Sequence, residues 1–257
     1  MKKTLIIPDV HGRTFWIEPC KWAVENDIPI IFLGDYFDPY GYEGITPEMA
    51  IENGKKLTNF VNENRELCTT LIGNHDLEYL GYPWFPQGGR HSRTHQDEII
   101  NLLCRLPLQL AYLEDNNLFT HAGISTHWGK ALIDSPYWND ELSPDENLNI
   151  LLTKALVDKE MKARDLLSYV GYARGGWNNS GSCVWADISE TIQCKPFKYY
   201  TQIVGHNQLR GDDCIYARKY NGEDHPNLND IWYLDCRRAF IIDENNKIKP
   251  WENENEN

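Results

Sequence analysis

The sequence predicts an α/β protein with a parallel sheet, from two alternating patterns in its first third. Three short apolar runs, at residues 4–8, 28–33 and 67–72, have the composition of buried strands. Residues 14–26 and 46–62 lie between them and carry apolar side chains at roughly helical spacing. A strand–helix–strand–helix–strand order implies parallel neighbours, because each helix carries the chain back to the start of the next strand.

The remainder of the chain predicts further strands and a helical insertion. Residues 95–106 are expected to be helical, and residues 108–113 and 117–120 to form a strand pair. Residues 126–195 are more polar and include a helical stretch at 147–169, so we interpret them as an inserted cap. Closing strands are expected at 202–204, 214–220, 231–235 and 239–242. The prediction is therefore one domain over residues 1–257 with a cap insertion at about 126–195.

Composition excludes several classes of function. The 257 residues are 41% hydrophobic and carry a net charge of −13, which suits a globular protein and disfavours general binding to nucleic acid or anionic membranes. A small phosphorylated substrate remains compatible, because bound metal ions can invert the local field. The sequence has no apolar run long enough to span a bilayer, and its seven cysteines form no C-x-x-C pair. We therefore expect a cytoplasmic protein with reduced thiols.

Five apolar runs end in polar clusters, which carry the candidate chemistry. In an open α/β sheet, ligands bind beyond the carboxyl ends of the strands, so clusters far apart in the sequence are expected to converge. The clusters are Asp9-x-His11, Gly34-Asp35-x-x-Asp38, Gly73-Asn74-His75-Asp76, His121 and Gly205-His206.

These residue types indicate a site for divalent metal ions. Carboxylate oxygen and imidazole nitrogen together suit Mn²⁺, Fe²⁺ or Zn²⁺. Asp9 and His11 are two apart on extended chain, so both side chains can point at one ion. A carboxylate such as Asp35 can bridge two ions about 3.5–4 Å apart. Each cluster alone has a plainer explanation, such as a surface loop, a helix cap or a buried histidine, but five such coincidences in one chain are improbable.

The clusters, in this order and spacing, resemble those of the calcineurin-like metallophosphoesterase superfamily. The segment Thr120-His121-Ala122-Gly123-Ile124 and the two single late histidines are most similar to the branch of PPP-type serine/threonine phosphatases and its bacterial relatives. The resemblance covers roughly residues 4–125 and 200–208. It implies a two-sheet α/β/β/α sandwich with a helical cap insertion.

The resemblance also implies a mechanism and roles for individual residues. The reaction would be in-line attack of a metal-bridging hydroxide on a phosphate monoester, with no phosphoenzyme. His75 would be the general acid, oriented and kept protonated by Asp38. Two divalent transition-metal ions would be bound, the first by Asp9, His11 and Asp35 and the second by Asp35, Asn74, His121 and His206.

One position departs from the pattern of the PPP branch. Those phosphatases usually have a phosphate-binding arginine directly after the second Asp of Gly-Asp-x-x-Asp, and this chain has Pro39 there. Arg13 and Arg174 are the two candidate replacements, and Arg174 is preferred because Arg174-Gly175-Gly176 resembles a phosphate-facing segment of bacterial relatives. The missing arginine leaves the substrate open between a phosphoprotein and a small phosphate ester.

Two further functions stay open on the sequence alone. An aromatic-rich cap suits a nucleotide-type hydrolase acting on dinucleoside polyphosphates or phosphodiesters. The fold could also serve a catalytically silent binding or scaffold protein, although retention of all six ligand candidates and His75 disfavours that. The sequence does not indicate which metal is bound or the oligomeric state.

Overall fold

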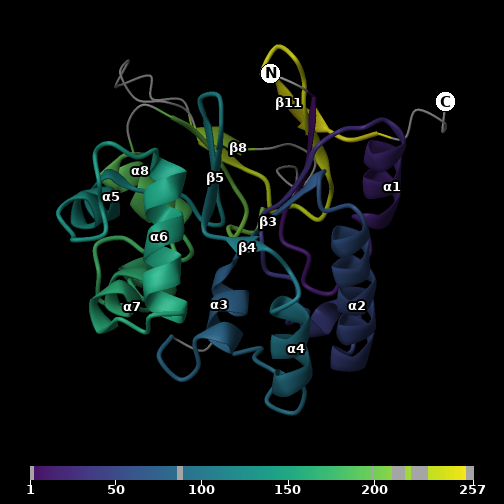
Figure 1. Ribbon diagram of the computed structural model, residues 1–257, viewed down its shortest axis with the longest axis horizontal. Coiled ribbons are helices and arrows are strands. Elements are labelled where there is room, and N and C mark those ends of the chain that lie inside the picture. The colour runs from purple at the N-terminus through teal and green to yellow at the C-terminus, as the bar shows by residue number, and fades with distance from the viewer. Residues whose placement is uncertain (1–2, 86–88, 198–199, 210–217, 221–230, 253–257) are drawn as a thin grey trace.

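A computed structural model describes residues 3–85, 89–197, 200–209, 218–220 and 231–252. Two sheets lie face to face between two groups of helices (Figure 1). In the described residues the first sheet has six strands, in the order β11 (Ile248–Pro250), β10 (Phe240–Ile242), β1 (Thr4–Ile7), β2 (Ile30–Phe32), β3 (Cys68–Leu71) and β4 (Leu108–Gln109). The second has five, in the order β5 (Ala111–Glu114), β6 (Asn117–Thr120), β7 (Thr201–Val204), β9 (Ile231–Tyr233) and β8 (Arg218–Tyr220).

The helices flank this double sheet. In Figure 1, α1 and α2 lie on the side of the first sheet, and α5 to α8 lie on the opposite side of the molecule. The helices are α1 (Ile17–Glu25), α2 (Pro47–Glu63), α3 (Asn74–Leu80), α4 (Gln96–Leu103), α5 (Thr126–Ile133), α6 (Pro144–Leu156), α7 (Met161–Leu167) and α8 (Ile188–Cys194), with short 3₁₀ turns at η1 (Gly41–Glu43) and η2 (Tyr172–Arg174). The predicted two-sheet α/β/β/α sandwich is confirmed.

Strand β1 shows why the apolar runs predicted strands buried on both faces. Its side chains alternate between two cores, because successive residues of a strand point to opposite faces. Leu5 and Ile7 pack in the core that includes residues of α1 and α2, and Ile6 packs in a second core shared by both sheets. Each side chain is fully buried, which stabilises the fold by about 1.5–3 kcal/mol.

Strands β1, β2, β3 and β4 run parallel to their neighbours, and so do β6, β7 and β9. The carboxyl ends of each parallel set therefore lie at one edge of a sheet. Strand β10 pairs antiparallel with both β1 and β11, β5 pairs antiparallel with β6, and β8 pairs antiparallel with β9. The parallel sets position the loops that carry the polar clusters.

The structure corrects two predicted elements. The strand expected over 108–113 is two strands, since β4 pairs with β3 in the first sheet and β5 pairs with β6 in the second. The helix expected over 147–169 is α6 and α7, and Lys159 between them has a left-handed backbone with φ 58°. The predicted strand at 214–220 is present as β8 over its last three residues, and residues 214–217 lie outside the described part of the chain.

Residues 126–195 contain α5 to α8 and connect two strands that pair directly, β6 and β7. Asn149 of α6 joins this layer to the second sheet, because its side chain accepts from Leu110 N and donates to Ala111 O. The role of this segment as a cap on one domain stays a prediction.

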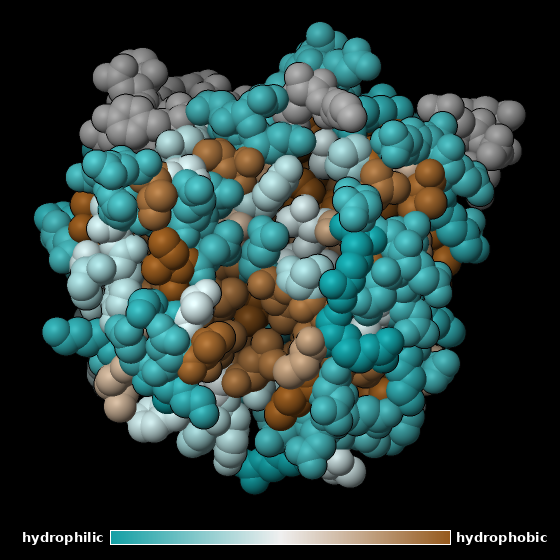
Figure 2. Space-filling view, in the orientation of Figure 1, coloured by the Kyte–Doolittle hydropathy of each residue, from teal (hydrophilic) through white to brown (hydrophobic). Residues whose placement is uncertain are grey.

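Hydrophilic side chains cover most of the face shown in Figure 2, and hydrophobic ones gather over α3, in a hollow between α6 and α4.

No helix in the described part of the chain has the length and apolar character needed to cross a membrane. The six described cysteines form no disulfide with one another.

Candidate metal centre and active site

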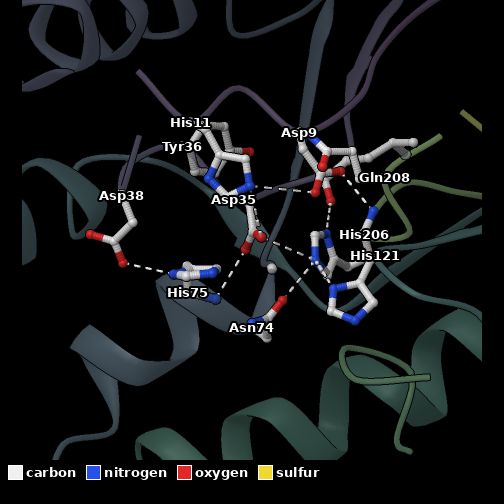
Figure 3. Close-up of polar contacts among 12 residues, drawn as sticks. Asp9, His11, Asp35, Tyr36, Asp38, Asn74, His75, His121, His206 and Gln208 are labelled. Carbon is white, nitrogen blue, oxygen red and sulfur yellow. Dashed lines mark hydrogen bonds and ion pairs between the residues drawn. The ribbon is translucent and has the colours of Figure 1, made fainter. Parts of the chain in front are cut away.

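The structure brings the predicted metal ligands together at the carboxyl ends of the parallel strands. Each follows its strand within a few residues, and the side chains converge from both sheets (Figure 3). All are nearly inaccessible to solvent, with His206 the most exposed at 7%. The residues are Asp9 and His11 after β1, Asp35 after β2, Asn74 at the start of α3, His121 after β6 and His206 after β7.

Four residues of this cluster have backbone angles that non-glycine residues rarely adopt. The φ angles are 45° for His11, 54° for Asp35, 59° for Asp38 and 61° for His206. Each such conformation costs about 1–3 kcal/mol and persists only where surrounding structure imposes it. The chain turns sharply at the end of each strand, and this is how the side chains come to face one point.

The glycines beside the cluster serve close packing. A Cβ on Gly73 would collide with the carboxylate of Asp35, and a Cβ on Gly205 would collide with that of Asp9. Both glycines have backbone angles open to any residue, so the missing side chain is what matters at these positions. The two carboxylates occupy the space that side chains at 73 and 205 would take.

Asp35 lies between two groups of potential ligands. Its Oδ2 is 3.6 Å from His11 Nε2 and 3.5 Å from His121 Nε2. Asp9 Oδ2 lies 3.8 Å from His11 Nε2, and Asn74 Oδ1 lies 3.1 Å from His121 Nε2. Ligand atoms about 2.0–2.2 Å from a common cation are separated by distances of this order. The arrangement fits one cation on each side of Asp35.

Hydrogen bonds fix the histidine rings with one nitrogen toward the cluster. His11 Nδ1 donates to Phe37 O at 2.8 Å, and His121 Nδ1 donates to Leu33 O at 2.7 Å. Since a carbonyl can only accept, each Nδ1 carries a proton, and each Nε2 is the nitrogen that faces the cluster. His206 Nε2 is buried and has no hydrogen-bond partner among the described residues. These features fit histidines that bind metal.

Charge in the buried cluster favours cations. Burial alone would lower the pKa of His121, but the carboxylates of Asp35 and Asp9 raise it to about 10. Burial raises the pKa of Asp9, with Asp35 adding to the effect. A bound divalent cation would neutralise the same carboxylates whose charge raises the pKa of His121.

Asp76 bonds the loop after β2 to the start of α3. Its Oδ2 accepts from Asp35 N at 2.7 Å and from Gly73 N at 2.9 Å, and its Oδ1 accepts from Tyr36 N at 3.1 Å. The carboxylate is fully buried, and burial followed by the charge of Asp35 raises its pKa to about 7. Asp76 thus ties the loop after β2 to the start of α3.

His75 and Asp38 form a buried pair beside the cluster, at the left of Figure 3. His75 Nδ1 lies 2.7 Å from Asp38 Oδ2, and Tyr79 Oη donates to Asp38 Oδ1. Tyr79 Oη in turn accepts from Ser92 N at 2.7 Å, so the Tyr79 hydroxyl and the Ser92 amide hold Asp38 and, through it, the imidazole. Burial alone would lower the pKa of His75, but Asp35 and Asp38 outweigh burial and raise it to about 8.

Sequence reasoning missed Arg90, which reaches this pair from the loop after α3. Its Nη2 donates to His75 Nε2 at 2.9 Å, its Nη1 donates to Asp38 O at 2.6 Å, and its guanidinium lies 3.6 Å from the centre of the Tyr40 ring. Arg90, Tyr40 and His75 line a cavity of about 130 Å³ together with His11, Asp35, Asn74, Arg174, Trp185 and His206. No motif marks Arg90 in the sequence.

Of the two arginines expected to bind phosphate, Arg174 lines this cavity and Arg13 does not. Arg174 is positioned by Asp187, whose Oδ2 is 2.9 Å from its Nε, and by Asn207 Oδ1, 2.8 Å from its Nη2. Arg13 makes a two-pronged pair with Glu43, from Nε at 2.8 Å and from Nη2 at 3.0 Å. The third nitrogen of this guanidinium, Nη1, donates to Asp9 O at 3.1 Å, so all three nitrogens of Arg13 are bonded within the protein.

The sequence analysis also missed Asp235, another buried carboxylate near Asp9. It follows β9 as Asp9 follows β1, so the pattern of a strand followed by an acidic residue could have found it. Asp235 is fully buried, and neither of its carboxylate oxygens has a hydrogen-bond partner among the described residues. Burial and the nearby charge of Asp9 raise its pKa well above the ordinary range.

Solved phosphatase structures share this architecture. A cold-active protein-tyrosine phosphatase of a psychrophilic Shewanella species superposes with a TM-score of 0.53 and 15% identity, over 98% of this chain and 81% of that one. A second cold-active protein tyrosine phosphatase structure gives 0.50 at 16% identity, over 97% and 78%. A metallophosphoesterase of Sphaerobacter thermophilus gives 0.41 at 16% identity, over 97% and 88%. No family model and no curated protein matches the sequence. The two phosphatase structures with TM-scores of 0.53 and 0.50 have the predicted fold.

Proposed function

We propose that this chain is a dimetal-dependent phosphoesterase that hydrolyses phosphate monoesters. One observation carries the proposal: Asp35 Oδ2 lies almost equally far from His11 Nε2, at 3.6 Å, and from His121 Nε2, at 3.5 Å. A carboxylate between two sets of donors is what a site for two neighbouring cations requires. The phosphatase neighbours agree with this reaction class at the level of the fold.

The ligands of the two ions divide around Asp35. Asp9, His11 and Asp35 would hold the first ion, and Asp35, Asn74, His121 and His206 would hold the second. Carboxylate and imidazole donors suit Mn²⁺, Fe²⁺ or Zn²⁺. When bound, such a pair of cations neutralises charge on phosphoryl oxygens and lowers the pKa of water to near neutrality.

Two arginines are placed to bind the phosphoryl group. Arg174 and Arg90 line the same cavity as the metal-ligand candidates, and a guanidinium can donate two parallel hydrogen bonds to a phosphate. Arg90 would take the role that the PPP branch gives to the arginine missing at Pro39. The cavity of about 130 Å³ suits a group the size of a phosphoryl group.

His75 would protonate the departing alkoxide. Its Nδ1 is bonded to Asp38, so Nε2 is the atom directed at the cavity. Arg90 Nη2 donates to that Nε2, so Arg90 has to leave before the atom can hold a proton. A phosphoryl group that attracts the Arg90 guanidinium would release Nε2 for general acid catalysis.

The proposed substrate is a phosphorylated protein or a small phosphate ester, and we propose a cytoplasmic location. An assay panel tests the reaction class: a monoester, a diester, a phosphopeptide and a dinucleoside polyphosphate, each with Mn²⁺, Fe²⁺ or Zn²⁺ and with a chelator. Hydrolysis of the monoester that the chelator abolishes supports the proposal. Preference for the diester or the polyphosphate supports the nucleotide-type hydrolase, and inactivity on all four supports a silent binding protein.

A further inference from the structure

A second cavity, of about 280 Å³, lies directly beside the first. It is bounded by the loop after β2, the start of α2 and the start of α4, and it is partly open to solvent. Its polar lining consists mainly of Asp38, Arg90 and Ser92. The remaining wall is mostly apolar and includes Phe37, Ile45, Pro47, Ala50, Ile51 and Ile99.

The side chain of Arg90 lines both cavities. Its guanidinium is held over the Tyr40 ring at 3.6 Å and bonded to Asp38 O and to His75 Nε2. Tyr40 lines the first cavity, while its chain neighbours Pro39 and Gly41 line the second. Arg90 and the Tyr40 segment therefore form the wall between the two spaces.

The position of His75 indicates which part of a substrate would enter the second cavity. In the proposed reaction, the ester oxygen of the leaving group accepts a proton from His75 Nε2, so the leaving group lies next to that atom. Arg90 Nη2 is 2.9 Å from His75 Nε2, and the second cavity lies along the same guanidinium. A leaving group beside Nε2 that extends past Arg90 enters the apolar cavity.

We propose that the second cavity is a leaving-group subsite that selects phosphate monoesters with an apolar group of one or two rings. The inference rests on the proposed function and adds the class of substrate. A cavity of about 150 Å³ lined by apolar side chains is enough to bind benzene. The space of 280 Å³ therefore accommodates a ring system larger than a single benzene.

The lining also disfavours other leaving groups. The carboxylate of Asp38 already bonds to His75 and Tyr79, and Ser92 N donates to Tyr79 Oη. Few polar groups of the lining are therefore left to bond a leaving group. A sugar, a nucleobase or a peptide backbone would bury polar groups without hydrogen bonds, which costs about 1–3 kcal/mol for each group. An apolar ring has no hydrogen-bonding groups to leave unpaired, and most of the wall that it meets is apolar.

Two esters of similar leaving-group acidity test the proposal, namely phenyl phosphate and naphthyl phosphate, assayed with Mn²⁺ on the full chain. The extra ring is expected to raise kcat/KM about tenfold or more, because an added apolar group in a fitting pocket gives discrimination of this size. Ile45 lies half-buried on the cavity wall, so Ile45→Trp fills the space. That variant is expected to lower kcat/KM more for naphthyl phosphate than for phenyl phosphate, and so to bring the two esters within about twofold of each other.

Ile133→Trp is the matched control, since Ile133 is an exposed isoleucine on α5 outside both cavities. It is expected to keep the wild-type preference. Ser92→Phe fills the cavity from another wall and serves if Ile45→Trp does not fold. Binding of naphthyl phosphate, followed by its own fluorescence, gives a second readout that does not depend on turnover.

The outcomes separate the two proposals. Equal kcat/KM for both esters in the wild type, or a preference that survives Ile45→Trp and Ser92→Phe, overturns the subsite while the phosphoesterase stands. If neither ester is hydrolysed with any of the three metals, the proposed function fails. In that case, binding of naphthyl phosphate that both filled variants leave unchanged overturns the subsite as well.

Discussion

Arg90 Nη2 donates a hydrogen bond to His75 Nε2 at 2.9 Å, and this contact joins an arginine of the cavity wall to the proposed proton donor. Two influences on the imidazole oppose each other. The carboxylates of Asp35 and Asp38 raise its pKa to about 8, whereas the donated bond requires Nε2 to be unprotonated. Arg90 itself lowers the pKa of His75, so its movement to a substrate would both free Nε2 and favour the protonated ring.

Arg90→Ala is expected to lower kcat/KM for a phosphate monoester by about 10–100-fold, because hydrogen bonds between charged groups contribute about 1.5–3 kcal/mol. Arg90→Lys should recover only part of the loss, since an ammonium cannot make two parallel bonds to a phosphate. The exposed Arg93, in the same loop, provides the control Arg93→Ala. Wild-type kinetics in Arg90→Ala would exclude Arg90 from substrate binding.

His75→Ala is expected to lower kcat by about 10²–10⁴-fold on an ester with a poor leaving group, and by less on one with a good leaving group, because only the poor one needs a proton. Asp38→Asn should show the same dependence more weakly, since Asp38 acts by holding the His75 ring at 2.7 Å. Metal content should stay at the wild-type value in both. His127→Ala, at an exposed histidine of α5, is the control. An equal loss on both esters would contradict the role of His75 as acid.

Asp35→Asn is expected to reduce bound metal from about two ions per chain to one or fewer, because an amide offers a single neutral oxygen where a carboxylate would bridge. Elemental analysis of the purified variant measures this directly, and thermal unfolding checks that it is folded. Asp97→Asn changes an exposed carboxylate of α4 and should leave the metal content unchanged. Full metal content in Asp35→Asn would remove the carboxylate from the site.

The sequence predicted the metal-ligand cluster because strand ends and their polar residues are local features. Asp9, Asp35 and His121 each follow a buried apolar run, and parallel strands bring such positions to one edge. The left-handed φ of 61° at His206 could not be predicted, because the backbone there is held by a contact distant in sequence, the bond from His206 N to Asp9 Oδ1. The break between β4 and β5 was also hidden, since residues 108–113 contain no Gly or Pro to mark where the chain passes from one sheet to the other.

Arg90 and Arg13 show where sequence reasoning about the site ends. Arg13 lies close to Asp9 in the sequence, yet its guanidinium is held by Glu43, 30 residues away. Arg90 has no motif around it and reaches Asp38 across 52 residues. Such pairings depend on tertiary contacts between loops, which no local pattern encodes.

Glu43 offers a prediction on stability and pH. Its Oε2 accepts from Arg13 Nε at 2.8 Å, and its Oε1 accepts from Arg13 Nη2 at 3.0 Å and from Arg237 Nε at 2.7 Å. Burial alone would raise the pKa of Glu43, but the two arginines outweigh burial and lower it below the ordinary 4.5. The carboxylate thus joins the loop after β2 to the first polar cluster and to the segment after β9.

Glu43→Gln should lower the free energy of unfolding by about 1–3 kcal/mol near neutral pH, since it leaves the buried guanidinium of Arg13 without its counter-charge. A carboxyl whose pKa is lower in the folded state stabilises the fold above its unfolded pKa, and loses this effect as pH falls through the folded pKa. The difference between wild type and variant should therefore shrink as pH falls below about 4.5. Urea unfolding at several pH values measures this difference in the free energy of unfolding.

The control is Glu18→Gln, which removes a solvent-exposed pair with Lys21 and should change stability by less than about 0.5 kcal/mol at any pH. A Glu43→Gln difference that stays constant with pH would show that the carboxylate charge does not stabilise this junction.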